Sequence, residues 1–162
     1  WKAIQTVLKK HDILLIADEV VTGFGRLGSM MGTTHYGIEA DIITIAKGLT
    51  SAYAPLSGSI LSDGVWKVLE QGTDELGPIG HGWTYSAHPI GAAAGVANLE
   101  LIDTLGLVGN AKETGAYFNE ALQDALGGGG IASPRIDPQG KAFGQMALEM
   151  LVEVPRDLVE SA

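Results

Sequence analysis

Charged residues follow two strongly apolar runs in this 162-residue sequence. Residues 13–21 read ILLIADEVV, which places Asp18 and Glu19 after an apolar run, and residues 41–48 read DIITIAKG, with Lys47 near their end. Uninterrupted apolar runs are typical of strands in parallel sheets, because both faces of such sheets are covered. Ligands bind beyond the carboxyl ends of these strands, so we expect Asp18 and Lys47 to meet at one edge. A purely structural ion pair is the alternative interpretation of these two residues.

Lys47 and Asp18 are residue types that together suit covalent catalysis through a Schiff base. A lysine at the end of a covered strand is poorly solvated, which favours the neutral amine that attacks carbonyl groups. Gly48 follows directly and adds no side-chain bulk, so a flat ring could approach the lysine. An aspartate facing the lysine could hold a proton on a heteroaromatic nitrogen. A Schiff-base lysine with an aspartate at the pyridinium nitrogen is typical of sites for pyridoxal 5'-phosphate (PLP).

Strands and helices alternate along the sequence, and this pattern predicts the elements that must place these residues. Apolar runs predict strands over 13–21, 41–48 and 56–62, and helical spacing predicts helices over 1–11, 64–71, 89–105 and 111–126. Asn110 and Glu113 have the spacing of a capping box, which indicates that the last helix begins beside them. Such alternation is typical of the α/β class, with a mainly parallel sheet flanked by helices.

The composition is that of a packed, acidic protein, and the length predicts one domain or one lobe of something larger. Hydrophobic residues make up 46% and charged residues 18%, and the net charge is −9. This charge offers no basic footprint for nucleic acid, and no apolar stretch approaches the roughly 20 residues of a membrane span. The sequence contains no Cys, which favours a reducing, cytoplasmic location. Its four His residues show no metal-ligand spacing, so we expect no metal.

Three segments, in this order, resemble the class III, fold-type I aminotransferases, which are PLP-dependent transferases, and the ω-transaminases among them in particular. They read ILLIADEVVTGFGRLG at 13–28, DIITIAKGLTSAYAPLSG at 41–58 and GHGWTYSAHPIGAAAGVANLELI at 80–102. The spacing between Asp18 and Lys47 also agrees with that family. The resemblance implies a homodimeric enzyme that moves an amino group between an amine or ω-amino acid and a keto acid such as pyruvate.

Carried over to the matching positions, the resemblance implies roles for five residues. Lys47 would be the catalytic residue, which forms the Schiff base with the cofactor and later carries the proton during amino transfer. Asp18 would hold the proton on the pyridinium nitrogen, and Val20 would pack against the ring. Trp83 and Thr84 would reach the phosphate of the cofactor that the neighbouring subunit binds.

Simpler roles are open to several residues near these positions. Without the motif context, Val20 would be an ordinary core residue and Thr84 an ordinary loop hydroxyl. Arg26 stands in the GFGR turn of the resemblance, where we expect a structural role. We expect Glu19 to form a salt bridge or to have no partner.

The resemblance covers residues 1–126, which we interpret as a PLP-binding segment of the large domain. Residues 127–162 are expected to be a divergent tail, either the start of a C-terminal small domain or a degraded one. The tail lacks the motif in which the family's carboxylate-binding arginine would stand. The Gly- and Ser-rich turn that grips the cofactor phosphate is not found in the sequence either. A catalytically inactive, truncated transaminase is therefore the second interpretation.

Nucleotide-binding α/β domains are the third interpretation. ILLIADE has the form of a Walker B strand, but the required G-x-x-x-x-G-K-[ST] loop is absent, since Gly140-Lys141 is followed by Ala142. Residues 23–28, GFGRLG, match G-x-G-x-x-G after a strand, yet the stretch after them is a poor amphipathic helix. Both patterns are weaker evidence of function than the three segments that match the aminotransferases in the same order.

Overall fold

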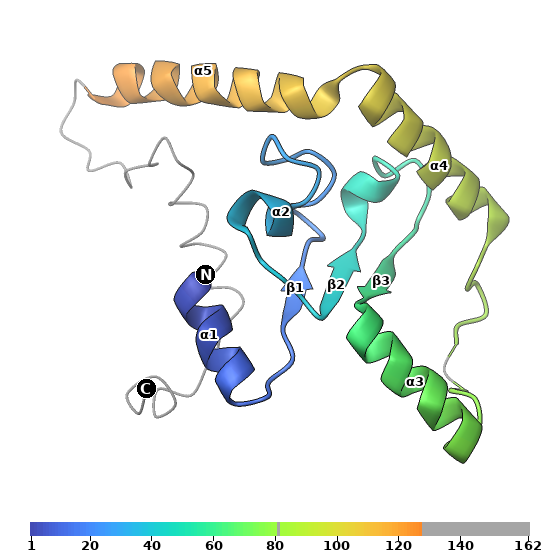
Figure 1. Cartoon of the computed structure of the whole chain (residues 1–162). Helices are drawn as coiled ribbons and strands as arrows, with labels where there is room; N and C mark the ends of the chain where they lie inside the picture. The colour runs from blue at the N-terminus through green and yellow to red at the C-terminus, as the bar shows by residue number, and fades with distance from the viewer. Residues whose placement is uncertain (81, 128–162) are drawn as a thin grey trace. The chain divides into compact units, whose positions relative to one another are not determined.

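The computed structural model describes residues 1–80 and 82–127 and shows helices alternating with three short strands (Figure 1). This arrangement confirms the α/β class. The elements in chain order are α1 (Lys2–Lys10), β1 (Ile16–Asp18), α2 (Gly32–Tyr36), β2 (Ile42–Ile45), the 3₁₀ helix η1 (Lys47–Leu49), β3 (Gly58–Leu61), α3 (Asp63–Leu76), α4 (Pro89–Thr104) and α5 (Leu107–Gly127).

The chain divides into two compact units, Trp1–Ala111 and Lys112–Ala162. The first unit contains the sheet and helices α1 to α4. The second is described only over residues 112–127, which continue α5. Residues 128–162 of the expected divergent tail lie outside the described residues. The domain boundary at residue 126 therefore stays a prediction.

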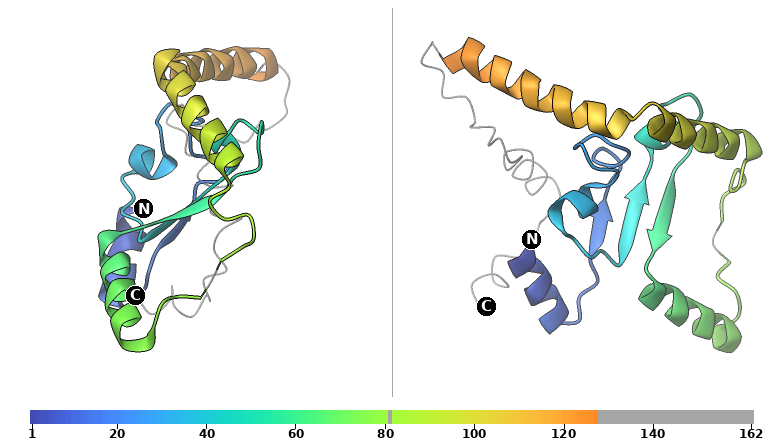
Figure 2. Two further views of the ribbon diagram at one scale, coloured as in Figure 1. Left: turned by 90° about the vertical axis from the view of Figure 1, so that its right-hand side faces the viewer. Right: turned by 45° about the horizontal axis from the view of Figure 1, so that its top comes forward.

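The sheet has the order β1-β2-β3 and is mixed rather than mainly parallel. β1 and β2 run parallel, with Asp18 opposite Thr44, whereas β3 runs antiparallel to β2, with Gly58 opposite Ile45 (Figure 2). Parallel pairing places the carboxyl ends of β1 and β2 at the same edge. The chain segments that carry Asp18 and Lys47 therefore leave the sheet side by side.

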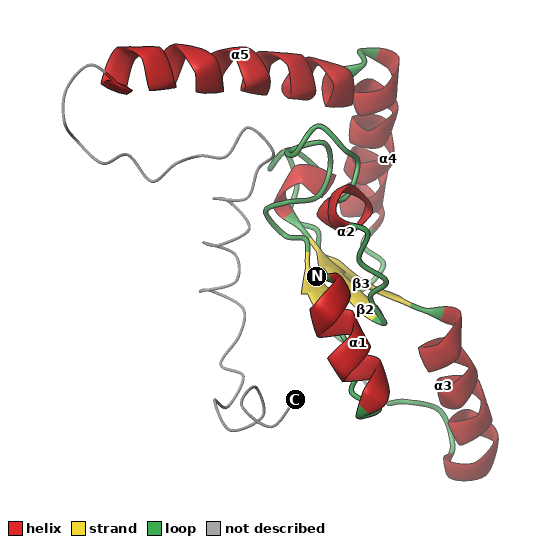
Figure 3. Ribbon diagram, turned by 60° about the vertical axis from the view of Figure 1, so that its left-hand side comes forward, coloured by secondary structure: helices red, strands yellow, loops and turns green. Residues whose placement is uncertain are grey.

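The strands are shorter and less covered than the apolar runs predicted (Figure 3). Ile16 in β1 is 57% exposed, and β2 is only half-buried along its length. In the described part of the chain, α3 contacts β3 and α4 contacts η1, while β1 and β2 mainly contact neighbouring strands. The expectation of strands covered on both faces is therefore wrong for these residues, because no helix layer among them covers those faces.

Helix boundaries follow the predictions for α1 and α4 and differ for α3 and α5. α3 continues through Gly72 to Leu76, beyond the end at residue 71 that the sequence predicted. α5 begins at Leu107, so the expected capping box is wrong. Asn110 already lies in the helix, and its N–H donates to the Gly106 carbonyl at 3.1 Å. The chain turns immediately after α4, which lets the next helix begin earlier than the local sequence pattern indicates.

The best-buried side chains lie around η1, α4 and the segment after β1. Among the described residues, the buried apolar side chains are Leu49 of η1 and Ile102 of α4. Glu19, Thr33 and Thr50 are buried polar residues.

The described helices include no single one that is long and apolar enough to cross a membrane, although α4 followed by α5 passes that test as a bent pair.

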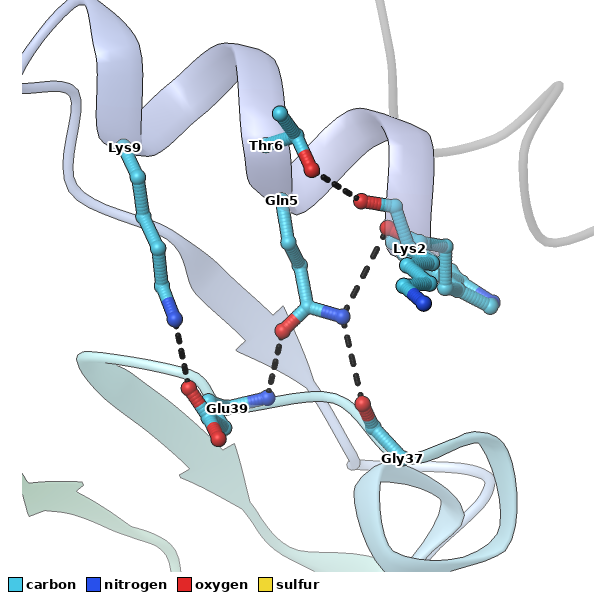
Figure 4. A network of polar contacts seen from close by, with 7 residues as sticks. Lys2, Gln5, Thr6, Lys9, Gly37 and Glu39 are labelled. Atoms are coloured by element: carbon cyan, nitrogen blue, oxygen red, sulfur yellow. Dashed lines mark hydrogen bonds and ion pairs between the residues drawn. The ribbon is translucent and has the colours of Figure 1, made fainter.

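Helix α1 is tied to the segment before β2 by three polar contacts (Figure 4). The Gln5 Oε1 atom accepts from the Glu39 N–H at 2.8 Å, and Gln5 Nε2 donates to the Gly37 carbonyl at 3.1 Å. Lys9 Nζ lies 2.6 Å from Glu39 Oε2. The hydrogen bond and charge of this pair raise the pKa of Lys9 and lower the pKa of Glu39.

The Lys9–Glu39 pair predicts how the stability of the chain depends on pH. Because the pKa of Glu39 is lowered, the stabilisation by the pair is present above its ordinary value of 4.5 and is lost as pH falls through the lowered pKa. Because the pKa of Lys9 is raised, the stabilisation is present below 10.5 and is lost as pH rises through the raised pKa. The difference in unfolding free energy between the wild type and Lys9→Met, measured in urea, should therefore be largest between these limits.

Lys10→Met is the matched control for this measurement, since no ion pair in the described residues involves Lys10. Added salt should shrink the effect of Lys9→Met, because the pair is exposed to solvent. Equal pH profiles for the two variants would contradict the assigned role of the pair.

Candidate active site

Asp18 is the last residue of β1, and two donors orient its carboxylate. The Val20 N–H donates to Asp18 Oδ1 at 2.9 Å, and the Thr44 hydroxyl donates to the same oxygen at 3.1 Å. No other donor among residues 1–80 and 82–127 reaches this carboxylate, so Oδ2 keeps its acceptor capacity. The parallel register explains the Thr44 contact, because Thr44 is opposite Asp18. Asp18 is thus exposed at the edge with one oxygen held and the other open to a ligand.

Lys47 begins η1 directly beyond β2 and has a backbone φ of +41°. This left-handed conformation is uncommon for a residue with a side chain, and strained backbone of this kind clusters at functional sites. Lys47 is exposed, so the described residues do not supply the desolvation expected for it. The ion pair found in the described part of the chain is Lys9–Glu39, so Asp18 and Lys47 are not joined as a structural pair. The structural alternative for these two residues is therefore wrong.

Glu19 anchors the segment that follows Asp18. Its side chain is 2% exposed and accepts hydrogen bonds from the Thr22 hydroxyl and from the backbone N–H groups of Gly32 and Thr33. The last two belong to the first turn of α2, whose N-cap residue contributes no side-chain bond. The carboxylate therefore satisfies backbone donors that a helix start leaves without partners. The expectation of a salt bridge or no partner is wrong for Glu19.

Residues 23–28 form a closed turn rather than a dinucleotide-binding loop. The N–H groups of Phe24 and Gly25 both donate to the Met30 carbonyl, at 2.6 and 3.3 Å. These amides are therefore directed into the turn, and the helix that follows, α2, has only 5 residues. A Cβ at Gly48 would lie 3.1 Å from the Phe24 Cβ, so this turn packs closely against the residue after Lys47. The absence of a side chain at Gly48 therefore makes room for Phe24 of this turn.

The structure separates the other predicted site residues into two groups. Val20 is half-buried beside Asp18, at the same edge as Lys47. Trp83 and Thr84 are exposed in the loop between α3 and α4, where the Trp83 N–H donates to the Ser86 hydroxyl at 3.0 Å. That loop follows α3 on the β3 side of the sheet, away from β1 (Figure 1). The roles of these residues toward a cofactor stay predictions.

Arg26 is exposed, and no hydrogen bond or ion pair in the described part of the chain holds its guanidinium group. Its expected structural role stays a prediction. The described residues also contain no group of three or more His, Asp or Glu side chains that could hold a metal ion.

The sequence analysis missed two polar residues that shape this edge. Thr44 orients Asp18, and its signal is a lone hydroxyl residue inside the apolar run IITIA. Asn98 of α4 donates to the carbonyls of Gly48 and Leu49, next to Lys47. Its signal is an amide residue on a helix otherwise rich in small and apolar residues. Both contacts join segments far apart in the sequence, so no local pattern reveals them.

Comparison with known proteins decides the family. Residues 1–131 match the family model described as aminotransferase class III. The chain belongs to this family. Class III aminotransferases are PLP-dependent enzymes, so both nucleotide-binding interpretations are wrong.

The relatives of this class III chain are transaminases. A diaminobutyrate–2-oxoglutarate transaminase of Halomonas elongata is 59% identical over 154 residues, which cover 94% of this chain and 32% of the relative. A putrescine–pyruvate aminotransferase of Pseudomonas aeruginosa is 42% identical and matches 76% of this chain and 26% of its own length. The chain thus spans about a third or less of the relatives it matches.

Solved transaminases have the same fold as this class III chain. One structure, from work on directed evolution by ancestral reconstruction, has a TM-score of 0.78 and 62% identity, and the match covers 79% of this chain and 28% of that one. The ω-transaminase of Pseudomonas jessenii in complex with PMP has a TM-score of 0.75 and 38% identity, with 83% and 28% covered.

The residues at the carboxyl edge fit the family's cofactor. A pyridinium N–H requires a carboxylate acceptor, and Asp18 Oδ2 is open while Oδ1 is fixed by the chain itself. An aldehyde requires an accessible amine, and Lys47 is exposed beyond the adjacent strand. The donor and acceptor groups of this edge therefore suit that cofactor, and the roles of Asp18 and Lys47 toward it stay predictions.

Glu19 generates a prediction about the stability of this edge. Glu19→Ala would leave two buried backbone N–H groups without an acceptor, which should lower the free energy of unfolding by about 3 kcal/mol. Chemical denaturation followed by circular dichroism measures this loss. Glu70→Ala, at an exposed position of α3, is the matched control and should change stability by less than about 0.5 kcal/mol. A similar small change for Glu19→Ala would contradict its anchoring role.

Proposed function

We propose that this chain forms the cofactor-binding part of an aminotransferase that moves an amino group between an amine and a keto acid. The observation that carries this proposal is that Asp18 ends β1 and Lys47 follows β2, the parallel strand beside it, with the aspartate pre-oriented by Thr44. When bound, PLP supplies an electron-withdrawing ring and a reactive aldehyde carbon. The work left to the protein is to hold the ring, to keep its nitrogen protonated and to move one proton.

Each residue at the edge has a distinct task in this proposal. Asp18 Oδ2 accepts the hydrogen bond of the pyridinium N–H and stabilises its positive charge. Lys47 Nζ would hold the cofactor covalently and would carry the proton that amino transfer moves. Val20 contacts a face of the ring, while its backbone N–H keeps Asp18 in place.

The substrate class follows from the chemistry that the relatives' names share. Diaminobutyrate, γ-aminobutyrate and putrescine all carry an amino group at the end of a carbon chain. We therefore infer a donor with such a terminal amine. The named acceptors are 2-oxoglutarate and pyruvate, so the acceptor of this chain is a 2-keto acid.

The exposed loop between α3 and α4 supports a second part of the proposal, a homodimer. Trp83 is 74% exposed and Thr84 is exposed, on a loop away from β1. A hydroxyl group with nearby backbone N–H groups suits a phosphate dianion. We infer that this loop contacts the phosphate of the cofactor held at the Asp18–Lys47 edge of a second copy.

Exposure also favours the alternative that this chain by itself lacks activity. Lys47 and Asp18 are both exposed, and the residues of β1 and β2 beside them are at most half-buried. A charged site that water reaches gains less from electrostatic interactions than a closed one. In this alternative the edge is present, yet it holds the cofactor too weakly for turnover.

Covalent trapping tests the proposed role of Lys47. Incubation of the chain with PLP, followed by borohydride reduction and peptide mapping, should place the adduct mainly on Lys47, because the Asp18 carboxylate retains the ring beside it. Asp18→Asn should weaken PLP binding about tenfold to a hundredfold, since it removes a charge-assisted hydrogen bond. Asp74→Asn, exposed on α3, is the matched control. An adduct spread evenly over Lys9, Lys10, Lys67 and Lys112 would contradict the assignment.

Mixing two variants tests the proposed dimer. Copies carrying Lys47→Ala and copies carrying Thr84→Ala each have an incomplete site, but a mixed pair contains one site with both residues. If Thr84 acts on the second copy, mixing should restore trapping of PLP on Lys47 at about a quarter of all sites. Sedimentation of the mixture measures the pairing. No restoration in a mixture that does pair would contradict the assignment of Thr84 to the partner's site.

A further inference from the structure

A single amide side chain joins α4 to the turn that begins with Lys47. Asn98 Nδ2 donates to the carbonyls of Gly48 and Leu49, at 2.9 and 3.1 Å. Its Oδ1 accepts from the Ser51 hydroxyl at 2.7 Å. Both ends of the amide are therefore used, and all three partners lie within four residues of Lys47.

The turn that Asn98 contacts has an unusual backbone. Lys47, Ser51 and Ala52 have φ values of +41°, +49° and +64°, which residues with side chains rarely adopt. Such conformations cost free energy and persist only where the surroundings hold them. Within the turn, the Thr50 hydroxyl donates to the Ala54 carbonyl at 2.6 Å. This bond closes the later half of the turn. In the first half, the N–H groups of Leu49 and Thr50 donate to the carbonyls of Ala46 and Lys47, at 3.0 and 3.2 Å, and Asn98 adds hydrogen bonds from α4.

The face of α4 that carries Asn98 is shaped to approach this turn. Gly91, Gly95, Asn98 and Ile102 follow one another at helical spacing, so they share one face of α4. A Cβ at Gly95 would lie 3.2 Å from the Leu56 Cδ2 atom, and one at Gly91 would lie 3.3 Å from the Pro55 carbonyl oxygen. The helix backbone therefore comes close enough for the short Asn98 side chain to reach the carbonyls after Lys47.

We propose that Asn98 is a positioning residue for Lys47. By holding the carbonyls of Gly48 and Leu49, it fixes the strained turn and thereby the direction in which the Lys47 side chain leaves the end of β2. Asn98 touches neither the cofactor nor the substrate in this proposal. The inference rests on the proposed function, since the direction of Lys47 matters only if Nζ reacts with a group beside Asp18.

Asn98→Asp removes the N–H donors of the side chain while it keeps the size of the side chain and an acceptor oxygen. The aspartate keeps an oxygen for the Ser51 hydroxyl but has no N–H group and places a negative charge against two carbonyls. Hydrogen exchange of the amides of residues 48–51, followed by mass spectrometry, should become about tenfold faster in the variant. Ser51→Ala, which leaves both donors in place, should have a smaller effect. Asn119→Asp on α5 is the matched amide-to-acid control and should leave this exchange unchanged.

Reactivity of Lys47 distinguishes positioning from a merely structural role. The ratio of PLP trapped on Lys47 to PLP trapped on Lys67 is measured in molecules that circular dichroism shows to be folded. Asn98→Asp should lower this ratio several-fold, while the absolute reaction of Lys67 stays the same. A residue that only stabilised the fold would change the melting temperature and leave the ratio unaltered.

Each outcome decides one of the two proposals. Unchanged exchange at 48–51 in Asn98→Asp would overturn the inference about Asn98, whatever the cofactor does. Faster exchange with an unaltered trapping ratio would also overturn it, because the turn would then not control Lys47. Absence of a preference for Lys47 in the wild type would instead overturn the proposed function, and the exchange measurement would still report on the contact between Asn98 and the turn.

Discussion

The parallel pairing of β1 with β2 is the constraint on which the candidate site depends. It places Asp18 opposite Thr44, so that a hydroxyl from the second strand orients the carboxylate at the end of the first. It also makes both strands end at one edge, so the segment with Lys47 leaves the sheet beside the segment with Asp18. A shift of one residue in this pairing would turn the side chain opposite Asp18 to the other face. The chemistry of the edge is therefore a consequence of strand register.

Polar side chains and close packing together hold the loops at this edge. Glu19 is buried and satisfies backbone donors at the start of α2, and Asn98 satisfies backbone acceptors after Lys47. Both act on backbone that lies outside regular strands and therefore lacks ladder partners. Leu49 and Ile102 supply the buried apolar contacts nearby. This arrangement keeps Asp18 and Lys47 accessible while the backbone on either side of them is held.

The exposure of the sheet and the partial match to the relatives are consistent with each other. Ile16 and its neighbours have the apolar character of strands covered on both faces, yet the described residues leave them largely open. The chain covers 32% of the Halomonas elongata relative and 28% of the Pseudomonas jessenii structure. The local geometry of the Asp18–Lys47 edge nevertheless lies within this portion. Asp18 and Lys47, on which the proposed cofactor site depends, are thus close together in the sequence, whereas the relatives are much longer.

Residue types and motif order determined the family, the α/β class, the positions of α1 and α4 and the choice of Asp18 and Lys47, because these features depend on local pattern and on composition. The tertiary structure alone decided that β3 runs antiparallel, that α5 begins before Asn110, and that Glu19 is a buried acceptor rather than a member of an ion pair. It also decided the contacts of Thr44 and Asn98, whose partners are 26 and up to 50 residues away in the chain. Hydrogen bonds over such separations depend on how elements pack in space, and a periodic pattern along one segment carries no information about that packing.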